Sequence, residues 1–336
     1  MTADPLDALP PVATATARDL AAIDALLAAG EPVRIEGAIA GWPALAAGRS
    51  SPAALDAYLR RHDCGAPAPV MEAAPAAGGR FGYAADLREF SFTKRSRPLG
   101  ETLDRIARAA DDPAAGTIAI QMLPLDAQMP GFVTENPMPL LPASAKPKLW
   151  LGGRVRTQIH NDRDHNLACV IAGCRRFLLF PPDQVANLYI GPLETPPPLS
   201  LVDPEAPDFE RFPRFREALA AALVAELAPG DALLLPRYWW HHVVSRDRHN
   251  AMVNYWWGGA AAGPGDPHDA FLAALLAIKP LPPRERAYWR AMVDAHVFGD
   301  DGAAHIPPRL QGVLGQMTPA LRAALRQRLK AAARQS

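Results

Sequence analysis

The sequence has few cysteines and lacks the patterns of secreted and membrane-spanning proteins. Its 336 residues include three cysteines, Cys64, Cys169 and Cys174, an odd number without the spacing of a zinc site. This argues against a disulfide framework. The first residues, MTADPLDALPP, are acidic and interrupted by proline, unlike a signal peptide. No apolar run approaches the roughly 20 residues that span a bilayer. We therefore expect a cytoplasmic protein without a membrane partner.

A surplus of charge of either sign is also missing. Lys+Arg and Asp+Glu each total 35, so the formal net charge is zero. A dedicated nucleic-acid binder needs a basic surplus to neutralise phosphates, so we expect no nucleic-acid partner. Apolar residues make up 49% and charged residues 21% of the chain, which is typical of a protein that folds around a sizeable core.

Proline, by contrast, is abundant. At a count of 36 it breaks long helices and favours short strands, turns and loops. Short apolar or alternating runs predict strands at 149–153, 155–160, 166–171, 175–180, 232–235, 242–245 and 250–257. Gly173 is expected to supply the turn between the third and the fourth. Many short strands separated by turns predict a sandwich or a jelly-roll barrel of the cupin kind.

The patterns elsewhere divide the chain into three parts. These are an N-terminal lead (1–30), a core (31–258) and a helical region (259–336) that follows a Gly/Pro-rich linker. Further strands are expected at 32–39 and 117–123, whereas 64–90 is too rich in Gly, Ala and Pro to interpret. Helices are expected at 16–29, 51–61, 99–110, 215–227, 268–278, 283–297 and 318–333.

An HxD motif, formed by His160 and Asp162, is the first candidate for chemistry. Residues i and i+2 of a strand point to the same side, so both side chains can approach one ion. The segment 238–242, YWWHH, adds His241 and His242 behind another predicted strand. Two histidines and one carboxylate form the facial triad of non-haem Fe(II) oxygenases, whereas a structural zinc site usually includes cysteine. Strand alternation alone does not choose between His241 and His242.

The stretch 149–257 closely resembles the JmjC-type, cupin-like Fe(II)/2-oxoglutarate oxygenases. The matching segments, in the family's order, are LWLGGRVRTQIHND, NLACVIAGCRRFLLFPPDQVANLY, VDPEAPDFERFPRF, PGDALLLPRYWWHHVVS and NYWW. A looser resemblance to the asparaginyl hydroxylase group of this family covers 31–130, through PVRIEGAIAGWPAL, and the helical C-terminus has a counterpart there. The fold class implied is mainly β with flanking helices: a double-stranded β-helix core of the JmjC type, followed by a C-terminal helical region.

The resemblance also implies an activity. It implies Fe(II) as the metal, 2-oxoglutarate and O₂ as co-substrates, and hydroxylation of an unactivated C–H bond, first of all in a protein side chain. A small-molecule substrate is the main alternative, because the loop at 183–213 departs from the family pattern. A metal-binding cupin that serves only as a scaffold is the second alternative.

Site residues carry over one by one from the resemblance. His160, Asp162 and His241 match the iron ligands, since the family's second histidine directly follows the tryptophan. His242 and His165 are then packing or supporting residues. Arg175 stands where the family has the lysine that binds the distal carboxylate of 2-oxoglutarate, and a guanidinium can take over that role. The full set expected to contact 2-oxoglutarate is Thr157, Asn166, Arg175 and Asn254.

Departures from the family limit what it implies. Ala119 replaces a tyrosine that contacts 2-oxoglutarate in the asparaginyl hydroxylase group, beside a retained Gln121. Pro198 and Leu199 replace a substrate-binding Arg-Gln pair, so asparaginyl hydroxylation is not implied.

The C-terminal helices raise the question of assembly. Leu321, Leu325 and Leu329 form one apolar stripe that could dock on the barrel or on a second subunit. Because the C-terminal helices of the resembling hydroxylases lie in a two-fold interface, we expect a homodimer through residues 268–333.

Overall fold

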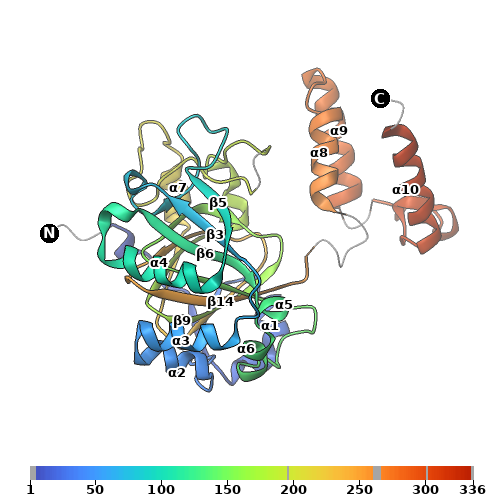
Figure 1. Ribbon diagram of the computed structural model, residues 1–336. Helices are drawn as coiled ribbons and strands as arrows, with labels where there is room; N and C mark the ends of the chain where they lie inside the picture. Colours follow the sequence, from blue (N-terminus) through green and yellow to red (C-terminus); the bar gives the residue numbers. More distant parts are fainter. Residues whose placement is uncertain (1–4, 195–196, 260–265, 300–301, 334–336) are drawn as a thin grey trace. The chain divides into compact units, whose positions relative to one another are not determined.

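The computed structural model describes residues 5–194, 197–259, 266–299 and 302–333 (Figure 1). The chain divides into two compact units, residues 1–259 and 260–336. The first unit contains the β-sheets and the helices that cover them, and the second consists of helices and turns.

Two β-sheets form the framework of the first unit. One has nine strands in the order β1-β2-β12-β9-β14-β7-β6-β3-β5, and the other has five in the order β11-β10-β13-β8-β4. The strand bounds are β1 Ala13–Thr16, β2 Val33–Glu36, β3 Ala68–Ala73, β4 Arg80–Phe81, β5 Phe92–Arg97, β6 Thr117–Pro124, β7 Lys146–Gly152, β8 Arg156–Asn161, β9 His165–Ala172, β10 Arg175–Phe180, β11 Leu223–Leu227, β12 Ala232–Leu235, β13 Trp240–Ser245 and β14 Asn250–Trp257.

The path of the chain through these sheets is that of a double-stranded β-helix. From β7 to β10 the chain alternates between the nine-stranded and the five-stranded sheet, and after β11 it alternates again from β12 to β14. Buried side chains from both sheets, such as Ala168, Phe177, Val243 and Met252, form one apolar layer between them. The predicted mainly β, cupin-type fold is therefore confirmed. Gly173, at φ +70°, makes the predicted turn between β9 and β10.

Helices cover the other face of the nine-stranded sheet (Figure 1). A second, larger apolar layer lies there, and it includes Leu55, Leu103, Leu149, Leu167 and Val253. The covering helices are α2 Pro43–Ser50, α3 Pro52–His62, α4 Leu99–Asp111, α5 Leu125–Gln128 and α6 Pro130–Glu135. The predicted start of α3 is confirmed, because the Ser51 hydroxyl accepts a hydrogen bond from the Ala54 amide at 3.0 Å.

The N-terminal segment joins the edges of the two sheets. The Val12 amide donates to the Val224 carbonyl at 3.0 Å, and the Val224 amide donates to Pro10 at 2.9 Å, which adds this segment to β11 of the smaller sheet. Directly afterwards, β1 pairs in parallel with β2 of the larger sheet. The Val12 side chain lies in the apolar layer between the sheets, so residues 10–16 help to close the barrel.

Two helix predictions are wrong in part. The helix expected at 16–29 is shorter, Ile23–Ala28 (α1), and follows β1 and a 3₁₀ turn. The helix expected at 215–227 ends at Ala220 (α7), and 223–227 forms β11 instead. At 223–227 the Ala-rich sequence has helical propensity, but pairing with β10 makes it a strand. The strand expected at 32–39 ends at Glu36 because Gly37, at φ +65°, turns the chain.

Five strands were not predicted as strands, namely β1, β3, β4, β5 and β11. The uninterpreted stretch 64–90 contains β3 and β4, and β5 follows it. β3 is paired on both sides, with β5 and β6, so it is an internal strand of the larger sheet despite its weak pattern.

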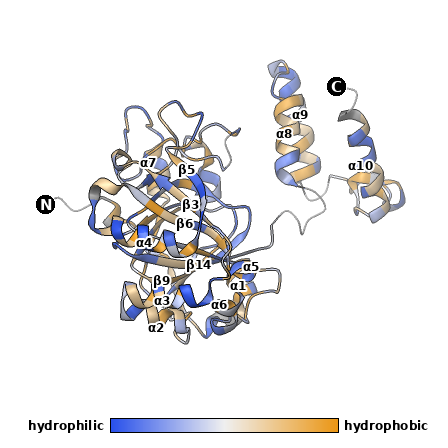
Figure 2. Cartoon of the chain, viewed as in Figure 1, coloured by the Kyte–Doolittle hydropathy of each residue, from blue (hydrophilic) through white to orange (hydrophobic). Residues whose placement is uncertain are grey.

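The second unit contains three α-helices among its described residues. They are α8 Pro267–Ala277, α9 Pro283–Val293 and α10 Pro319–Ala333, and a π-helical turn at 294–298 follows α9. The predicted helix at 283–297 therefore changes its hydrogen-bonding pattern near its end. Large apolar side chains are exposed here, including Leu276 at 77% and Phe298 at 76%; Figure 2 shows the hydrophobic colouring of α8. In the part of the chain that the structure describes, no helix is long and apolar enough to cross a bilayer.

Candidate metal centre

The site lies where β8 and β13 run antiparallel in the five-stranded sheet. His160 and His241 are directly opposite each other in this pairing. Asp162 follows the last residue of β8, and its Oδ2 lies 3.8 Å from His241 Nε2. One possible ligand atom from each of these three residues lies within 4.8 Å of the other two. The structure thus brings the imidazole of His241 together with a carboxylate and an imidazole that precede it in sequence by 79 and 81 residues.

Backbone carbonyls orient both imidazoles. His160 Nδ1 lies 2.9 Å from the Gln158 carbonyl, and His241 Nδ1 lies 3.0 Å from the Trp239 carbonyl. A carbonyl can only accept a hydrogen bond, so each Nδ1 carries the proton. Each Nε2 then keeps its lone pair, which is the state that a metal ligand requires.

A β-bulge explains how Thr157 joins this site. Thr157 lies three residues before His160, a spacing that would normally place the two side chains on opposite faces. In the pairing with β13, however, His160 lies opposite His241 while Thr157 lies opposite Val243, so β8 has one extra residue between them. Gln158 and Ile159 both contact the outer layer, and Thr157 faces inward with His160.

His241 and its neighbour His242 lie on opposite faces of β13. His242 pairs with Leu178, whose side chain belongs to the layer outside the barrel, and its Nε2 lies 4.0 Å from Glu205 Oε2. His241 therefore belongs to the cluster and His242 does not. His165 is also separate from it, and its Nδ1 accepts a hydrogen bond from the Arg237 amide at 3.3 Å.

Burial sets the protonation of the buried ligand. Desolvation, strengthened by the neighbouring His160, lowers the pKa of His241 to about 4. His241 is therefore neutral near pH 7, as metal binding requires.

The remaining predicted residues lie on the inner faces of the sheets. The Asn254 amide donates to Asn166 Oδ1 at 2.8 Å, across β14 and β9. Arg175 shares the inward face of β10 with Phe177 and is only 7% exposed. Burial lowers the pKa of its guanidinium to about 10. Among the described residues, no carboxylate pairs with it.

Several buried polar atoms on these inner faces have no hydrogen-bond partner among the described residues. They are Arg175 Nε, Asn254 Oδ1, Trp150 Nε1 and Trp256 Nε1. Buried polar groups in native proteins are normally paired, because an unpaired one costs roughly 1–3 kcal/mol. Several such atoms on the inward faces of one barrel are candidates to bind a polar ligand.

Strand β6 carries the departures noted in the sequence. Ala119 lies opposite Gly152 and is buried with Phe81 and Val155, so it offers no hydroxyl to the interior. A bulge follows, in which Gln121 and Met122 together oppose a single residue of β7, and Met122 has a φ of 61°. Gln121 is buried, whereas Met122 is 42% exposed.

Sequence analysis did not single out Lys148 and Trp150. Both lie on the inward face of β7, because the alternate residues Leu149 and Leu151 point into the helix-covered layer. The alternation of polar and apolar residues in KPKLWLG predicts that one face of the strand is not purely apolar. It does not predict which face of the strand lies inside the barrel.

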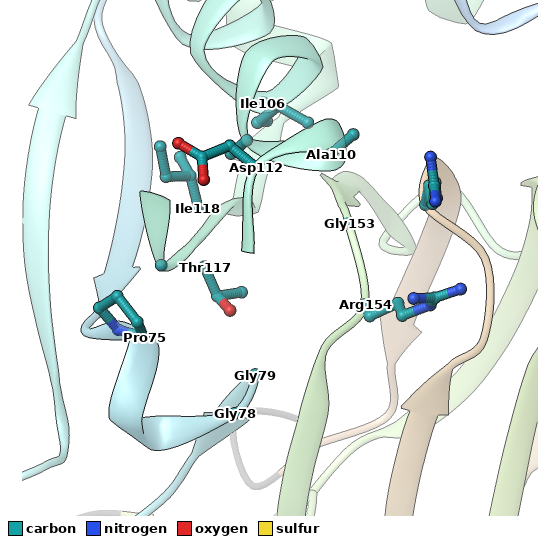
Figure 3. A pocket seen from close by; sticks show the side chains of 13 residues that line it. Pro75, Gly78, Gly79, Ile106, Ala110, Asp112, Thr117, Ile118, Gly153 and Arg154 are labelled. Carbon is teal, nitrogen blue, oxygen red and sulfur yellow. The ribbon is translucent and has the colours of Figure 1, made fainter. Parts of the chain in front are cut away.

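A pocket of about 270 Å³ lies elsewhere (Figure 3). Asp112 and Thr117 lie on one side of it and Arg154 on the other. Gly153 and Arg154 precede the first residue of β8, whereas His160 lies near the last, so this pocket is at the opposite end of the strand. The predicted ligands are not among its lining residues.

Comparison with known proteins agrees with this fold and site. Residues 20–262 match the family described as "Cupin-like domain". The chain belongs to the cupin-like domain family. Its relatives include JmjC proteins, which confirms the resemblance drawn from the motifs.

Three relatives illustrate this. Human HSPB1-associated protein 1 is 38% identical over 112 residues, which are 32% of this chain and 22% of the human protein. Lysine-specific demethylase JMJ31 of Arabidopsis thaliana is 30% identical over 142 residues, 42% of this chain and 25% of the demethylase. Jumonji C domain-containing protein 5 of Drosophila melanogaster is 34% identical over 118 residues, 34% of this chain and 28% of the fly protein. The matched segments span about a quarter of each relative.

Proposed function

We propose that this cupin-like protein is a cytoplasmic Fe(II)- and 2-oxoglutarate-dependent dioxygenase that hydroxylates an unactivated C–H bond. The observation that carries the proposal is the cluster of His160, Asp162 and His241, with both Nε2 atoms free to bind a metal. Two imidazoles and a carboxylate suit Fe(II) and leave three positions of an octahedron open. When bound there, Fe(II) together with 2-oxoglutarate supplies the means to activate O₂ for C–H oxidation.

The inner faces supply groups for the co-substrate. Arg175 is a buried cation to which no carboxylate of the described residues pairs, and its guanidinium matches a carboxylate in a two-pronged geometry. Thr157 lies on the same inward side, since it opposes Val243, which in turn opposes Phe177 on β10. We assign both to the distal carboxylate of 2-oxoglutarate, and the Asn166–Asn254 pair to the end nearest the metal.

The reacting substrate is, in this proposal, a side chain of another protein. The similarity to a protein named as a lysine-specific demethylase supports a protein substrate for this chain. A small-molecule substrate is the alternative, supported by the diverged loop at 183–213. A metal-binding scaffold without catalysis is less well supported, because all three candidate ligands are present and oriented.

Metal analysis under anaerobic conditions tests the proposal directly. We expect one Fe(II) for each chain, and release of succinate when 2-oxoglutarate and O₂ are added. His160→Ala, Asp162→Ala and His241→Ala should each reduce metal affinity by more than about 100-fold, because each removes a ligand. His242→Ala is the matched control and should retain the metal. Loss of iron in His242→Ala but not in His241→Ala would contradict the assignment.

A second proposal concerns assembly, in which two copies of the chain pair through residues 268–333. Support comes from the exposed apolar side chains of the helical unit, among them Phe271, Leu272 and Leu276 on α8. Leu321 and Leu325 of the predicted stripe are only half-buried, and Leu329 is 61% exposed. Burying this apolar surface against a second copy contributes about 25 cal/mol to association for each Å² removed from water.

Light scattering tests this pairing. The unaltered protein should have twice the chain mass of 36.1 kDa at micromolar concentration. Leu272→Glu with Leu276→Glu should yield monomers, as should Leu321→Glu with Leu325→Glu. A monomeric mass for the unaltered protein would refute the dimer.

A further inference from the structure

The metal-binding end of the barrel holds a lysine that the co-substrate does not account for. Lys148 lies on the inward face of β7, directly opposite Asn254 of β14 and two residues before Trp150. β7 begins at the end of the barrel where β8 and β14 finish, which is the end that carries His160 and Asp162. Lys148 thus lies at the mouth above the candidate metal centre.

The ammonium group of Lys148 rests on an aromatic ring. Its Nζ lies 5.2 Å from the ring centroid of Trp256, within the range of a cation–π contact. Within the described ranges, no carboxylate pairs with it. Lys146, on the same strand, is exposed, and its Nζ lies 3.5 Å from Asp126 Oδ2.

The neighbouring groups are hydrogen-bond donors. Trp150 and Trp256 are in edge-to-face contact, with centroids 6.1 Å apart, and the indole N–H of each is buried without a partner. An indole N–H and an ammonium can donate hydrogen bonds but cannot accept them. Lys148 and the two indoles thus present three donor-only groups on one inward surface, and an anion is the class of ligand to which such groups donate.

Partial exposure makes this surface reachable. Lys148, Trp150 and Trp256 are all half-buried, whereas Leu149, Val253 and Tyr255, on the other face of the same strands, are buried. Part of this inner surface is therefore accessible to solvent, although both indole nitrogens are buried.

From these observations we infer that the substrate is an acid, and that Lys148 binds its carboxylate or phosphate group at the mouth of the barrel. The inference rests on the proposed function and names the class of its substrate. Arg175 takes the co-substrate, so Lys148 and the two indole groups remain for the reacting molecule. A small acid and an acidic side chain next to the reacting residue of a protein share this chemistry, and the probes below distinguish them.

Anion binding to the full chain, loaded with Zn(II) and 2-oxoglutarate so that no turnover occurs, tests this inference. The probes are acetate, inorganic phosphate and a blocked hexa-aspartate peptide, and the neutral controls are acetamide and the corresponding asparagine peptide. Binding is followed through the indole ¹H–¹⁵N signals of Trp150 and Trp256. We expect saturable shifts with the acids and none with the neutral controls.

Variants of Lys148 decide whether this residue is responsible. Lys148→Met should weaken acid binding by about 10- to 100-fold, as expected for the loss of one charge-assisted contact. Lys148→Arg should bind acids within about threefold of the unaltered protein, and Lys146→Met is the matched control that should not differ. Lys148→Gln replaces Lys148→Met if the latter does not fold.

The outcomes separate this inference from the proposed function. Acid binding that is unchanged in Lys148→Met, or equal for acids and neutral controls, overturns the inference. A loss of 2-oxoglutarate affinity in Lys148→Met as large as the loss of acid affinity also overturns it, since Lys148 would then hold the co-substrate. Failure of the unaltered protein to bind metal or 2-oxoglutarate would instead refute the proposed function. Binding by the peptide alone would point to a protein substrate, and binding by the small acids alone to a metabolite.

Discussion

The two faces of the nine-stranded sheet are built from alternate residues of the same strands, yet only the inward face combines apolar side chains with polar ones of the candidate site. On β7, β9 and β14 the outward side chains, such as Leu149, Leu167 and Val253, are fully buried in the helix-covered layer. The inward ones include Lys148, Asn166 and Asn254, which belong to the candidate site. A strand thus contributes to stability on one side and to ligand binding on the other, because its side chains alternate.

The energetic roles of the two faces differ accordingly. The outward face removes apolar area from water, at about 25 cal/mol per Å². The inward face keeps polar atoms without partners, each at a cost of roughly 1–3 kcal/mol until a ligand binds. The stability gained from the buried outward face offsets this cost. Substitutions on the two faces should therefore have different effects on stability and on ligand binding.

Truncation on the outward face should have the largest effect on stability. Leu167→Ala leaves a cavity in a fully buried layer, and we expect the free energy of unfolding to fall by about 2–5 kcal/mol. Chemical denaturation measures this loss. Metal stoichiometry at 15 °C should stay at one per chain. A variant that kept its stability but lost its metal would contradict the assignment of stability to the outward face and of ligand binding to the inward face.

Lowering the pH should destabilise the metal-free protein by a comparable amount. His241 has a pKa of about 4 when folded and an ordinary value near 6.5 when unfolded. Between these values the unfolded chain binds a proton that the folded chain does not. Stability is therefore complete above pH 6.5 and falls as the pH drops towards 4, by about 3 kcal/mol for this histidine.

Denaturation of the metal-free protein at several pH values checks this dependence. His241→Gln, which has no titrating ring, should show a shallower decline. An equally steep decline in that variant would assign the effect to other groups, such as His242, whose pKa burial also lowers to about 4.

On the inward face, Arg175→Ala should weaken the binding of 2-oxoglutarate. The distal carboxylate of 2-oxoglutarate would lose a buried cation, which is worth about 1.5–3 kcal/mol, or roughly 10- to 100-fold in affinity. Anaerobic titration of the Fe(II)-loaded variant measures this. Arg176→Ala is the neighbouring control, because Arg176 pairs with Glu226 at the sheet surface. An unchanged dissociation constant in Arg175→Ala would mean that another cation binds the acid.

The smallest effect on stability is expected for the Asn166–Asn254 pair. Replacing both with leucine removes donor and acceptor together, which is often nearly neutral, so unfolding should change by less than about 1 kcal/mol. Affinity for 2-oxoglutarate should nevertheless fall. If this double variant were destabilised as strongly as Leu167→Ala, the inward face would also be structural.

Much of this arrangement was predictable from the sequence, for physical reasons. Short strands with turn residues, as in 149–180, specify a β-barrel, and HxD followed by WHH specifies the ligands once the family is identified. Gly173 was predictable because a tight turn with positive φ favours glycine.

What could not be predicted depends on contacts distant in sequence. Residues 223–227 look helical, and only pairing with β10 makes them a strand. The bulge that turns Thr157 inward leaves no mark in the residues RTQIH, because it arises from the pairing with β13. The inward position of Lys148 requires knowing which face of β7 the helices cover.

The closure of the barrel by its N-terminal segment has a consequence for biosynthesis. The indole of Trp239 donates to the Gly30 carbonyl, 209 residues earlier, and Arg34 pairs with Asp231, 197 residues later. At about 5–20 residues per second, the ribosome needs roughly 10–40 s to supply these partners. β2, one of the first strands to be synthesised, can pair with β1 early but must wait for β12 as its second neighbour, and the nascent chain must keep that edge from other contacts throughout the interval.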